Sequence, residues 1–321
     1  MIANNENSTI KAAVQDVCGL PVDTATAFTN HKGVYKKRFE KRQVTLLKKL
    51  GFLTPFLEPD EKILFVTAGM SPFSFLEQLL TGWILYQLKR CVFVLTDKRI
   101  LHIPTKSNLA YRSSIAQILY ADCALLQIKG RYLVAKYQNG KTEKFLGIPG
   151  GPRKKITEIL KTIPLQGRSS PMLERAHLCP RCTKPLVTGF YACPHCSLEF
   201  KNKIKARQYS VIFPGGGYFY SRHYLMGIMD AIGESLLTLF FIVALVDIIR
   251  GKPESVVAFG FIGVLLTVEK LITIHHANGF INEFIPVDGR ITANPGFEPM
   301  PANPGSPGQP EQTLAAGLTS R

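Results

Sequence analysis

Two long apolar stretches near the C-terminal end limit the possible folds of this chain more than any other feature. They cover residues 232–249 (18 residues) and 256–274 (19 residues), and the turn sequence RGKPES joins them. A helix of ~20 apolar residues spans the ~30 Å hydrocarbon core of a bilayer. The sequence therefore predicts a two-helix transmembrane hairpin, with its flanking segments, over residues 212–285. A buried helical hairpin in a soluble domain is the alternative interpretation.

Charge is distributed unevenly along the chain. Residues 1–227 hold 34 Lys and Arg against 14 Asp and Glu, whereas residues 228–321 hold 5 against 9, which gives the net charge of +16. A basic surface of this kind attracts nucleic acid or the anionic cytoplasmic leaflet of a membrane. Five Lys and Arg residues precede the first stretch from position 201 onward, but the turn between the stretches has only two. The positive-inside rule therefore predicts two spans with both termini in the cytoplasm.

Ionisable residues lie near the expected cytoplasmic ends of both spans. Asp230 and Glu234 are four residues apart and so share one helix face. In a symmetric antiparallel hairpin, Asp230 lies at the depth of His275, and Glu234 lies beside Lys270. Two interpretations remain open: a charge cluster that neutralises itself near the membrane interface, or an ion or proton site.

Two CxxC pairs, CPRC and CPHC, are separated by ten residues. Tetrahedral Zn²⁺ needs four thiolate or imidazole ligands, and each pair supplies two of them from a tight turn. We assign as ligands the four cysteines Cys179, Cys182, Cys193 and Cys196. Such a site has no open position, so we expect structural rather than catalytic Zn²⁺; a redox dithiol is the alternative.

The segment around these cysteines, residues 175–202, resembles a zinc ribbon, with TKPLVTGFYA between the pairs as two short strands. Zinc ribbons also bind nucleic acid, and several Lys and Arg residues flank this one. No aromatic-interleaved nucleic-acid motif accompanies them, and a ribbon beside a membrane would carry the same charges. Nucleic acid is therefore the less favoured partner.

The N-terminal region combines a polar segment, 1–33, which we expect to be poorly ordered, with a basic amphipathic helix over 34–54. Apolar residues recur at helical spacing in this helix, and its polar face is rich in lysine and arginine. The helix either packs its apolar face on the next domain or lies on an anionic membrane. The lysines expected to contact lipid headgroups are Lys36, Lys37, Lys41 and Lys48.

Residues 55–165 contain short β-branched and aromatic runs, with Asn139-Gly140 as a hairpin turn, followed by one helical segment that ends at Pro164. The sequences PFLEPDEKILFV (55–66) and VLTDKRILHI (94–103) make this region resemble bacterial PH-like or GRAM-type domains. The resemblance implies a bent seven-stranded barrel capped by a C-terminal helix. It also implies lipid or peptide binding, or self-assembly, without catalysis.

An apolar insertion, residues 71–90, departs from the strand pattern of that family. It contains Phe73, Phe75 and the single tryptophan, Trp83. Aromatic side chains mostly pack in cores, so we expect these three to be core residues. A patch that docks on a membrane or a partner is the alternative.

The sequence PGGGYFY (214–220) resembles the first segment of small bacterial two-span membrane domains, and residues 286–321 are rich in Pro, Gly and Asn, as in a disordered tail. Taken together, the sequence predicts a multidomain, non-catalytic scaffold, binding or sensor protein at the cytoplasmic face of a bacterial inner membrane. Its expected partners are membrane lipids with anionic headgroups and an unidentified protein or peptide. The alternatives are a membrane-tethered nucleic-acid-binding ribbon and a two-span ion- or lipid-handling protein.

Overall fold

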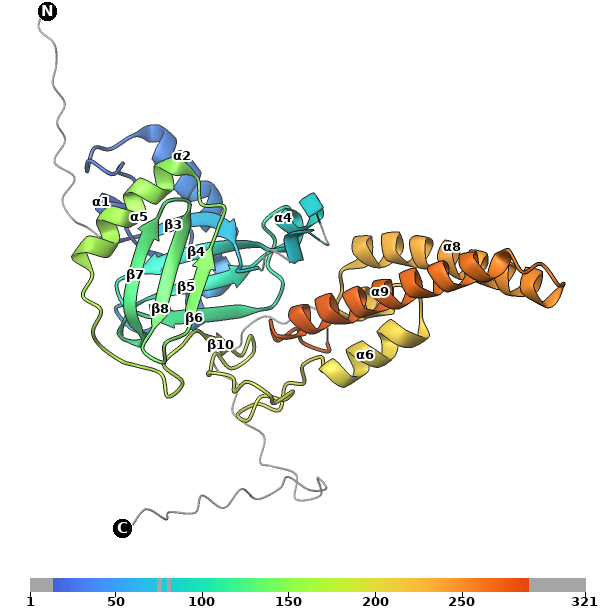
Figure 1. The fold of residues 1–321 in the computed structure, drawn as a ribbon. Coiled ribbons are helices and arrows are strands. Elements are labelled where there is room, and N and C mark those ends of the chain that lie inside the picture. Colours follow the sequence, from blue (N-terminus) through green and yellow to red (C-terminus); the bar gives the residue numbers. More distant parts are fainter. Residues whose placement is uncertain (1–13, 74–76, 80–81, 289–321) are drawn as a thin grey trace, which may run out of the picture.

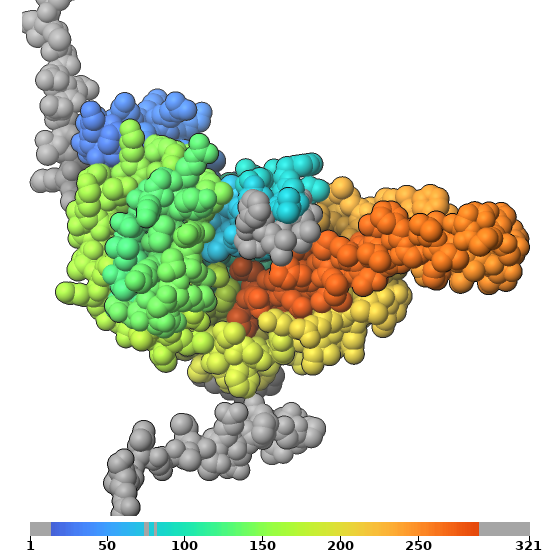
Figure 2. Space-filling view, viewed as in Figure 1, coloured from blue at the N-terminus to red at the C-terminus, as the bar shows by residue number. Residues whose placement is uncertain are grey.

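The structure, a computed structural model, describes residues 14–73, 77–79 and 82–288. A β-rich domain forms one end of the molecule, and a pair of long helices projects from it (Figures 1 and 2). The predictions for residues 1–13, for Phe75 and for most of the C-terminal tail lie outside the described residues.

The β-rich domain contains two sheets. Seven strands form the large sheet in the order β1-β2-β3-β4-β5-β6-β10, and three form the small sheet in the order β7-β8-β9. The strands are β1 (Val14–Asp16), β2 (Pro21–Asp23), β3 (Ile63–Met70), β4 (Arg90–Thr96), β5 (Arg99–Pro104), β6 (Ile115–Leu119), β7 (Cys123–Lys129), β8 (Tyr132–Tyr137), β9 (Thr142–Phe145) and β10 (Ala176–Leu178). The β2–β3 pairing is parallel, and the other paired strands are antiparallel.

The large sheet is buried on both faces, which explains why β4 reads as a continuous apolar run rather than an alternating one. One face packs with Phe65 and Phe93 against the small sheet and α5 (Gly150–Thr162). The other face is covered by α1 (Thr24–Ala27), α2 (Lys37–Leu47) and the short helix η1 (Gly51–Phe56). Among the described residues one isolated bridge, Met70 to Leu146, connects the two sheets, so a closed barrel is not shown.

The prediction of poor order for residues 1–33 is wrong for the described part, residues 14–33. Leu20 and Val22 are completely buried in the domain core, and β2 pairs with β3. The helix predicted over 34–54 is shorter, because α2 ends at Leu47 and a 3-10 helix follows. Leu46 and Leu47 on its apolar face pack into the core, so α2 covers the sheet.

A buried ion pair fixes the turn between β4 and β5. Arg99 binds both carboxylate oxygens of Glu61, at 2.7 and 3.0 Å, and donates to the Phe56 carbonyl at 2.7 Å and to Gln117. Burial alone would raise the pKa of Glu61, but the hydrogen bonds and charge of Arg99 outweigh it and hold this pKa below its ordinary value. The pair is therefore fully engaged inside the domain.

Trp83 is not a core residue. Its side chain is 73% exposed on the short helix η2 (Gly82–Ile84), which precedes α4 (Leu85–Leu88), and Leu79 beside it is 69% exposed. Phe73 is half-buried and packs edge-on against Tyr86. The insertion reaches the base of the helix pair, where Lys89 lies over the Phe280 ring (Figure 1).

Four helices follow the β-rich domain. They are α6 (Lys203–Ile212), α7 (Gly216–Tyr220), α8 (Tyr224–Ile249) and α9 (Ser255–Ile281). The helices α8 and α9 are long and apolar enough to cross a membrane, and little of their most apolar window is buried, 11% and 6% respectively. Helices in the core of a soluble protein would be mostly buried, so this exposure favours a bilayer environment.

Candidate functional site

The four cysteines form one compact cluster. Their sulfur atoms all lie within 4.8 Å of one another, and the Cys179–Cys196 and Cys182–Cys193 sulfur pairs are 3.5 and 3.6 Å apart. Four sulfurs at ~2.3 Å from a tetrahedral metal ion would be nearly 4 Å from each other. The donor set and its spacing therefore fit a closed four-thiolate metal site.

Two equivalent turns place these sulfurs. In each turn the first cysteine accepts a backbone hydrogen bond from the residue four positions later, from Thr183 to Cys179 and from Ser197 to Cys193, both at 2.9 Å. Thr183 and Ser197 both adopt positive φ angles, 62° and 53°. This conformation is costly for residues other than glycine, and the same strained turn at both CxxC pairs is consistent with a shared ligand-holding role.

Residues 175–202, called the ribbon below after their sequence resemblance, join the β-rich domain to the helix pair. On one side β10, which leads into Cys179, pairs with β6. On the other side the chain leaving α9 pairs with the end of the ribbon: the Lys201 N–H donates to the Ile285 carbonyl, and the Val287 N–H donates to the Glu199 carbonyl, both at 2.9 Å. Phe284 packs against the cysteine cluster. The ribbon thus leads into α6 at the start of the helical region and pairs with the chain that leaves α9 at its end.

Lys201 lies at this junction. Its ammonium group sits over the Tyr220 ring and donates to the Tyr220 carbonyl. Burial, together with the charge of Arg222, lowers the pKa of Lys201 to about 8.

A polar cluster occupies the base of the helix pair. Glu234 of α8 forms an ion pair with Lys270 of α9 and also accepts the Gly215 N–H at 3.2 Å. Lys270 in turn donates to the Ser210 carbonyl at 2.6 Å. Ser210 lies in the last turn of α6 and Gly215 at the start of α7, so the ion pair satisfies backbone groups where the chain reverses.

Glycine makes this reversal possible. Gly215 has a positive φ of 66°, and a Cβ there would overlap the Gly227 carbonyl oxygen. A Cβ at Gly216 would overlap the Tyr209 carbonyl oxygen. The turn therefore packs backbone against backbone, which no residue with a side chain allows without a shift.

The structure brings together Asp230, Glu234 and Lys270, but not His275. Asp230 accepts a hydrogen bond from Thr273 at 3.0 Å, and Glu269 joins the same acidic group. His275 is exposed, whereas the neighbouring His276 is buried and bonds the Tyr218 hydroxyl at 2.6 Å. Glu234 pairs with Lys270, the residue beside which a symmetric hairpin places it.

Glu269 and Thr273 also belong to this cluster, although they are not among the site residues predicted from the sequence. Their spacing to each other, four residues, was a usable signal for a shared helix face. The roles of Ser210 and Gly215 had no local signal, because they depend on how α6 and α7 fold back on the helix pair.

The four lysines of the basic helix are exposed, but they lie away from the helix pair. In Figure 1 α2 lies near α1 and α5, along the edge of the β-rich domain that is drawn at the top, and α8 and α9 project from another side. A cavity of about 350 Å³ lies between α2 and β3 and has three cationic side chains. Its lining residues are Arg38, Lys41, Arg42, Thr45, Leu46, Ala68 and Leu109.

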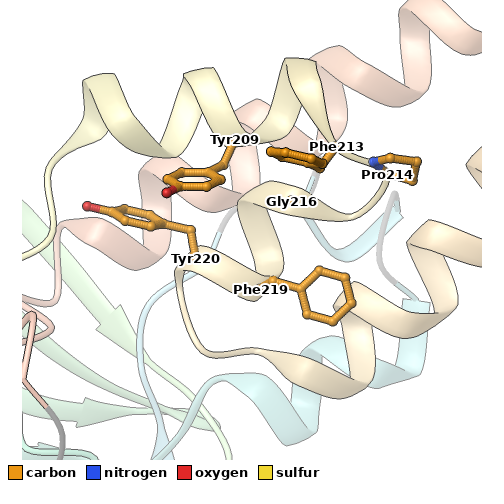
Figure 3. Close-up of a pocket in the computed structure, with 6 residues that line it drawn as sticks. All are labelled: Tyr209, Phe213, Pro214, Gly216, Phe219 and Tyr220. Carbon is orange, nitrogen blue, oxygen red and sulfur yellow. The ribbon is translucent and has the colours of Figure 1, made fainter.

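A second cavity, of about 530 Å³, lies against α6 and α7 at the base of the helix pair (Figure 3). It is lined by Tyr209, Phe213, Pro214, Gly216, Phe219 and Tyr220.

Comparison with protein families, with curated proteins and with solved structures finds no match to this chain.

Proposed function

We propose that this chain is a non-catalytic, membrane-anchored scaffold or binding protein at the cytoplasmic face of a bacterial inner membrane. Helices α8 and α9 act as the anchor, and the ribbon holds the β-rich domain against the bilayer surface. The observation that carries the proposal is the double attachment of the ribbon, through β10 to β6 and through residues 199–201 to the chain leaving α9.

This attachment distinguishes a scaffold from a flexible tether. A domain on a loose linker samples many orientations, whereas strand pairing on both sides of the ribbon restricts the domain to one. Further contacts at the base of the helix pair also restrict the orientation of the β-rich domain. Arg112 lies 2.7 Å from His223, and Ser114 donates to the Glu283 carbonyl at 2.5 Å. The role of the anchor is then to present a fixed face of the domain.

We assign Zn²⁺ to the four cysteines, in a structural role. Four thiolates complete a tetrahedral shell, which leaves no position for a substrate or a catalytic water. The metal would fix the two turns of the ribbon and, through them, the junction between the β-rich domain and the anchor.

We also propose that the β-rich domain is PH-like. Strands β3 to β6 and β7 to β9 give four plus three antiparallel strands, and α5 follows them in the chain, which is the element order implied by the sequence resemblance. The basic cavity beside α2 is its candidate binding surface. Because α2 lies away from the anchor, an acidic peptide or protein segment fits there better than a headgroup of the membrane that holds the anchor.

Cysteine labelling in intact cells of a bacterial expression host tests the topology. A Lys252→Cys variant places a thiol in the turn between α8 and α9, and Cys18 is a native, exposed thiol in the β-rich domain. A membrane-impermeant maleimide added outside should label the Lys252→Cys thiol and leave Cys18 unlabelled until the cells are opened. Labelling of Cys18 in intact cells, or protection of both thiols, would contradict the proposed orientation.

Metal analysis tests the ribbon. The purified, reduced full-length protein should contain one Zn²⁺ per chain, and Cys179→Ser should lose it, whereas Cys18→Ser should retain it. Because the metal supplies most of the folding free energy of such a module, Cys179→Ser should also make residues 175–202 sensitive to protease. A chain with no zinc, or a Cys179→Ser variant with full zinc content, would refute the assignment.

A further inference from the structure

The aromatic groove at the base of the anchor lies on the outside of the reversal between α6 and α7. Four aromatic rings and Pro214 line it, and three of these side chains are well exposed: Tyr209 (44%), Phe213 (55%) and Phe219 (36%). The Phe219 ring also covers Gly227, so the groove continues onto α8. It therefore opens on the same apolar surface that α8 would present to a bilayer.

The polarity of the groove changes along its length. In Figure 3 the hydroxyl groups of Tyr209 and Tyr220 point toward the β-rich domain, whereas Phe213 and Pro214 lie at the other end. The two tyrosine rings are stacked, with centroids 5.2 Å apart. Tyrosines oriented in this way are typical of a membrane interface, where the ring lies in the apolar region and the hydroxyl meets water.

A cationic side chain, Lys205, continues the change in polarity along the groove. Lys205, Tyr209 and Phe213 follow one another at four-residue spacing in and just after α6, so they share one helix face. Lys205 is exposed, and within the described part of the chain its ammonium group makes no hydrogen bond or ion pair. A phospholipid has the same order of groups: an anionic phosphate, a polar ester region and an apolar chain.

We propose that this groove binds one acyl chain of an anionic phospholipid, whose phosphate contacts Lys205. The inference rests on the proposed membrane anchor, because only a bilayer supplies lipid at this position. A lipid is favoured over a second copy of the chain because the groove is continuous with the apolar surface of α8 and because its polar end carries a cation.

Fluorescence quenching by brominated lipids tests the groove, since the chain has a single tryptophan. In a Trp83→Phe background, Phe213→Trp places an indole in the groove. The full-length protein is reconstituted in phosphatidylcholine vesicles that contain the same fraction of either brominated phosphatidylglycerol or brominated phosphatidylcholine. We expect phosphatidylglycerol to be enriched about fivefold at this indole, as ~1 kcal/mol per lysine near an anionic lipid implies.

Two variants test the role of Lys205. Lys205→Gln should abolish the preference for phosphatidylglycerol, whereas Arg207→Gln, two residues further along α6 and on a different face, should retain it. Equal quenching by both lipids would overturn the anionic preference. An indole shielded from both lipids would mean that a protein segment fills the groove, and would overturn the proposal.

A control variant separates this proposal from the anchor itself. Phe261 on α9 is 64% exposed, and Phe261→Trp in the same background should be quenched equally by both lipids. Quenching at Phe261→Trp without quenching at Phe213→Trp would refute the groove and leave the anchor intact. Absence of quenching at Phe261→Trp would refute the anchor.

Discussion

The β-rich domain and the base of the anchor each contain a buried glutamate paired with a cation, but the two pairs serve different purposes. In the domain, Arg99 binds Glu61 and joins it to the turn between β4 and β5, inside a large apolar core. At the base, Glu234 and Lys270 each bind a backbone group of the α6–α7 reversal. The first pair joins the turn between two strands to the Phe56 carbonyl, and the second supplies hydrogen-bond partners to the backbone of a buried turn.

The difference fits the environments that we propose for the two regions, water for the domain and a bilayer for the helix pair. In water, burial of apolar area stabilises the domain, so its buried polar groups need hydrogen-bond partners but do not have to drive folding. Helices in a bilayer gain little from apolar contacts with each other, and their association depends on close packing and hydrogen bonds. Glycines and polar side chains at the base of the anchor provide both.

The largest effect is expected in the domain. Arg99→Met should lower the free energy of unfolding by ~3–5 kcal/mol, because it leaves the Glu61 carboxylate buried without its partner. Lys98→Met is the matched control, since Lys98 forms only exposed contacts, a 3.4 Å ion pair with Glu58 and a 2.8 Å hydrogen bond to the Pro59 carbonyl, and its loss should change the free energy of unfolding by at most ~1 kcal/mol. Thermal unfolding in micelles, followed by circular dichroism, measures both. Equal effects of the two variants would mean that the buried ion pair contributes no more to the free energy of unfolding than the exposed contacts of Lys98.

A smaller effect is expected at the reversal. Gly216→Ala should destabilise the base by ~1–3 kcal/mol, because its methyl group meets the Tyr209 carbonyl oxygen and the backbones must separate. Gly233→Ala is the control within α8, where a Cβ meets nothing within 4 Å and alanine favours the helix. Hydrogen exchange of residues 205–220 should increase only for Gly216→Ala. An increase for both variants would assign the effect to the helix pair as a whole.

Removal of the charge at the base should cost less than removal of Arg99. Glu234→Gln keeps an acceptor for the Gly215 N–H, and Lys270 keeps the Ser210 carbonyl and can reach toward the interface, so we expect a loss of ~1–2 kcal/mol. Asp247→Asn, in an exposed ion pair with Lys252, should lose at most ~1 kcal/mol. Thermal midpoints in micelles give the comparison. A loss for Glu234→Gln as large as for Arg99→Met would show that the base behaves like a protein core.

The last effect concerns pH, and it accumulates gradually over two pH units. The pKa of Lys201 is lowered to about 8 in the folded protein, so between pH 8 and 10 the unfolded chain binds more protons than the folded one. The contribution of Lys201 to the free energy of unfolding should therefore rise with pH, by at most ~1.4 kcal/mol per pH unit. Comparison with Lys201→Met over this range isolates the effect. An identical pH dependence in both proteins would mean that Lys201 is not titrating at the junction.

Much of the candidate site could be predicted from the sequence because its signals are local. The CxxC spacing alone indicated the cysteine cluster, since each pair is held by one tight turn. The four-residue spacing of Asp230 and Glu234 placed them on one helix face, and the antiparallel arrangement placed Glu234 beside Lys270, where the two side chains form an ion pair.

Other features depended on contacts between distant parts of the chain. Pairing of β10 with β6 and of residues 199–201 with residues 285–287 joins segments far apart in sequence, for which periodicity carries no information. Trp83 shows the same limit of local sequence, because its residue type predicted burial and its side chain is exposed. An aromatic residue is usually buried, but Trp83 is 73% exposed, and its local sequence carries no signal for this exposure.

The sequence by itself thus determined which residues form the long apolar helices, the cysteine cluster and most of the strands, because these follow from composition and short-range spacing. The tertiary structure alone decided that the ribbon is a junction, that α2 lies away from the anchor, and that Ser210 and Gly215 complete the polar cluster. The physical reason is that unpaired backbone groups must find partners wherever the fold brings them, and those partners are set by the packing of whole elements.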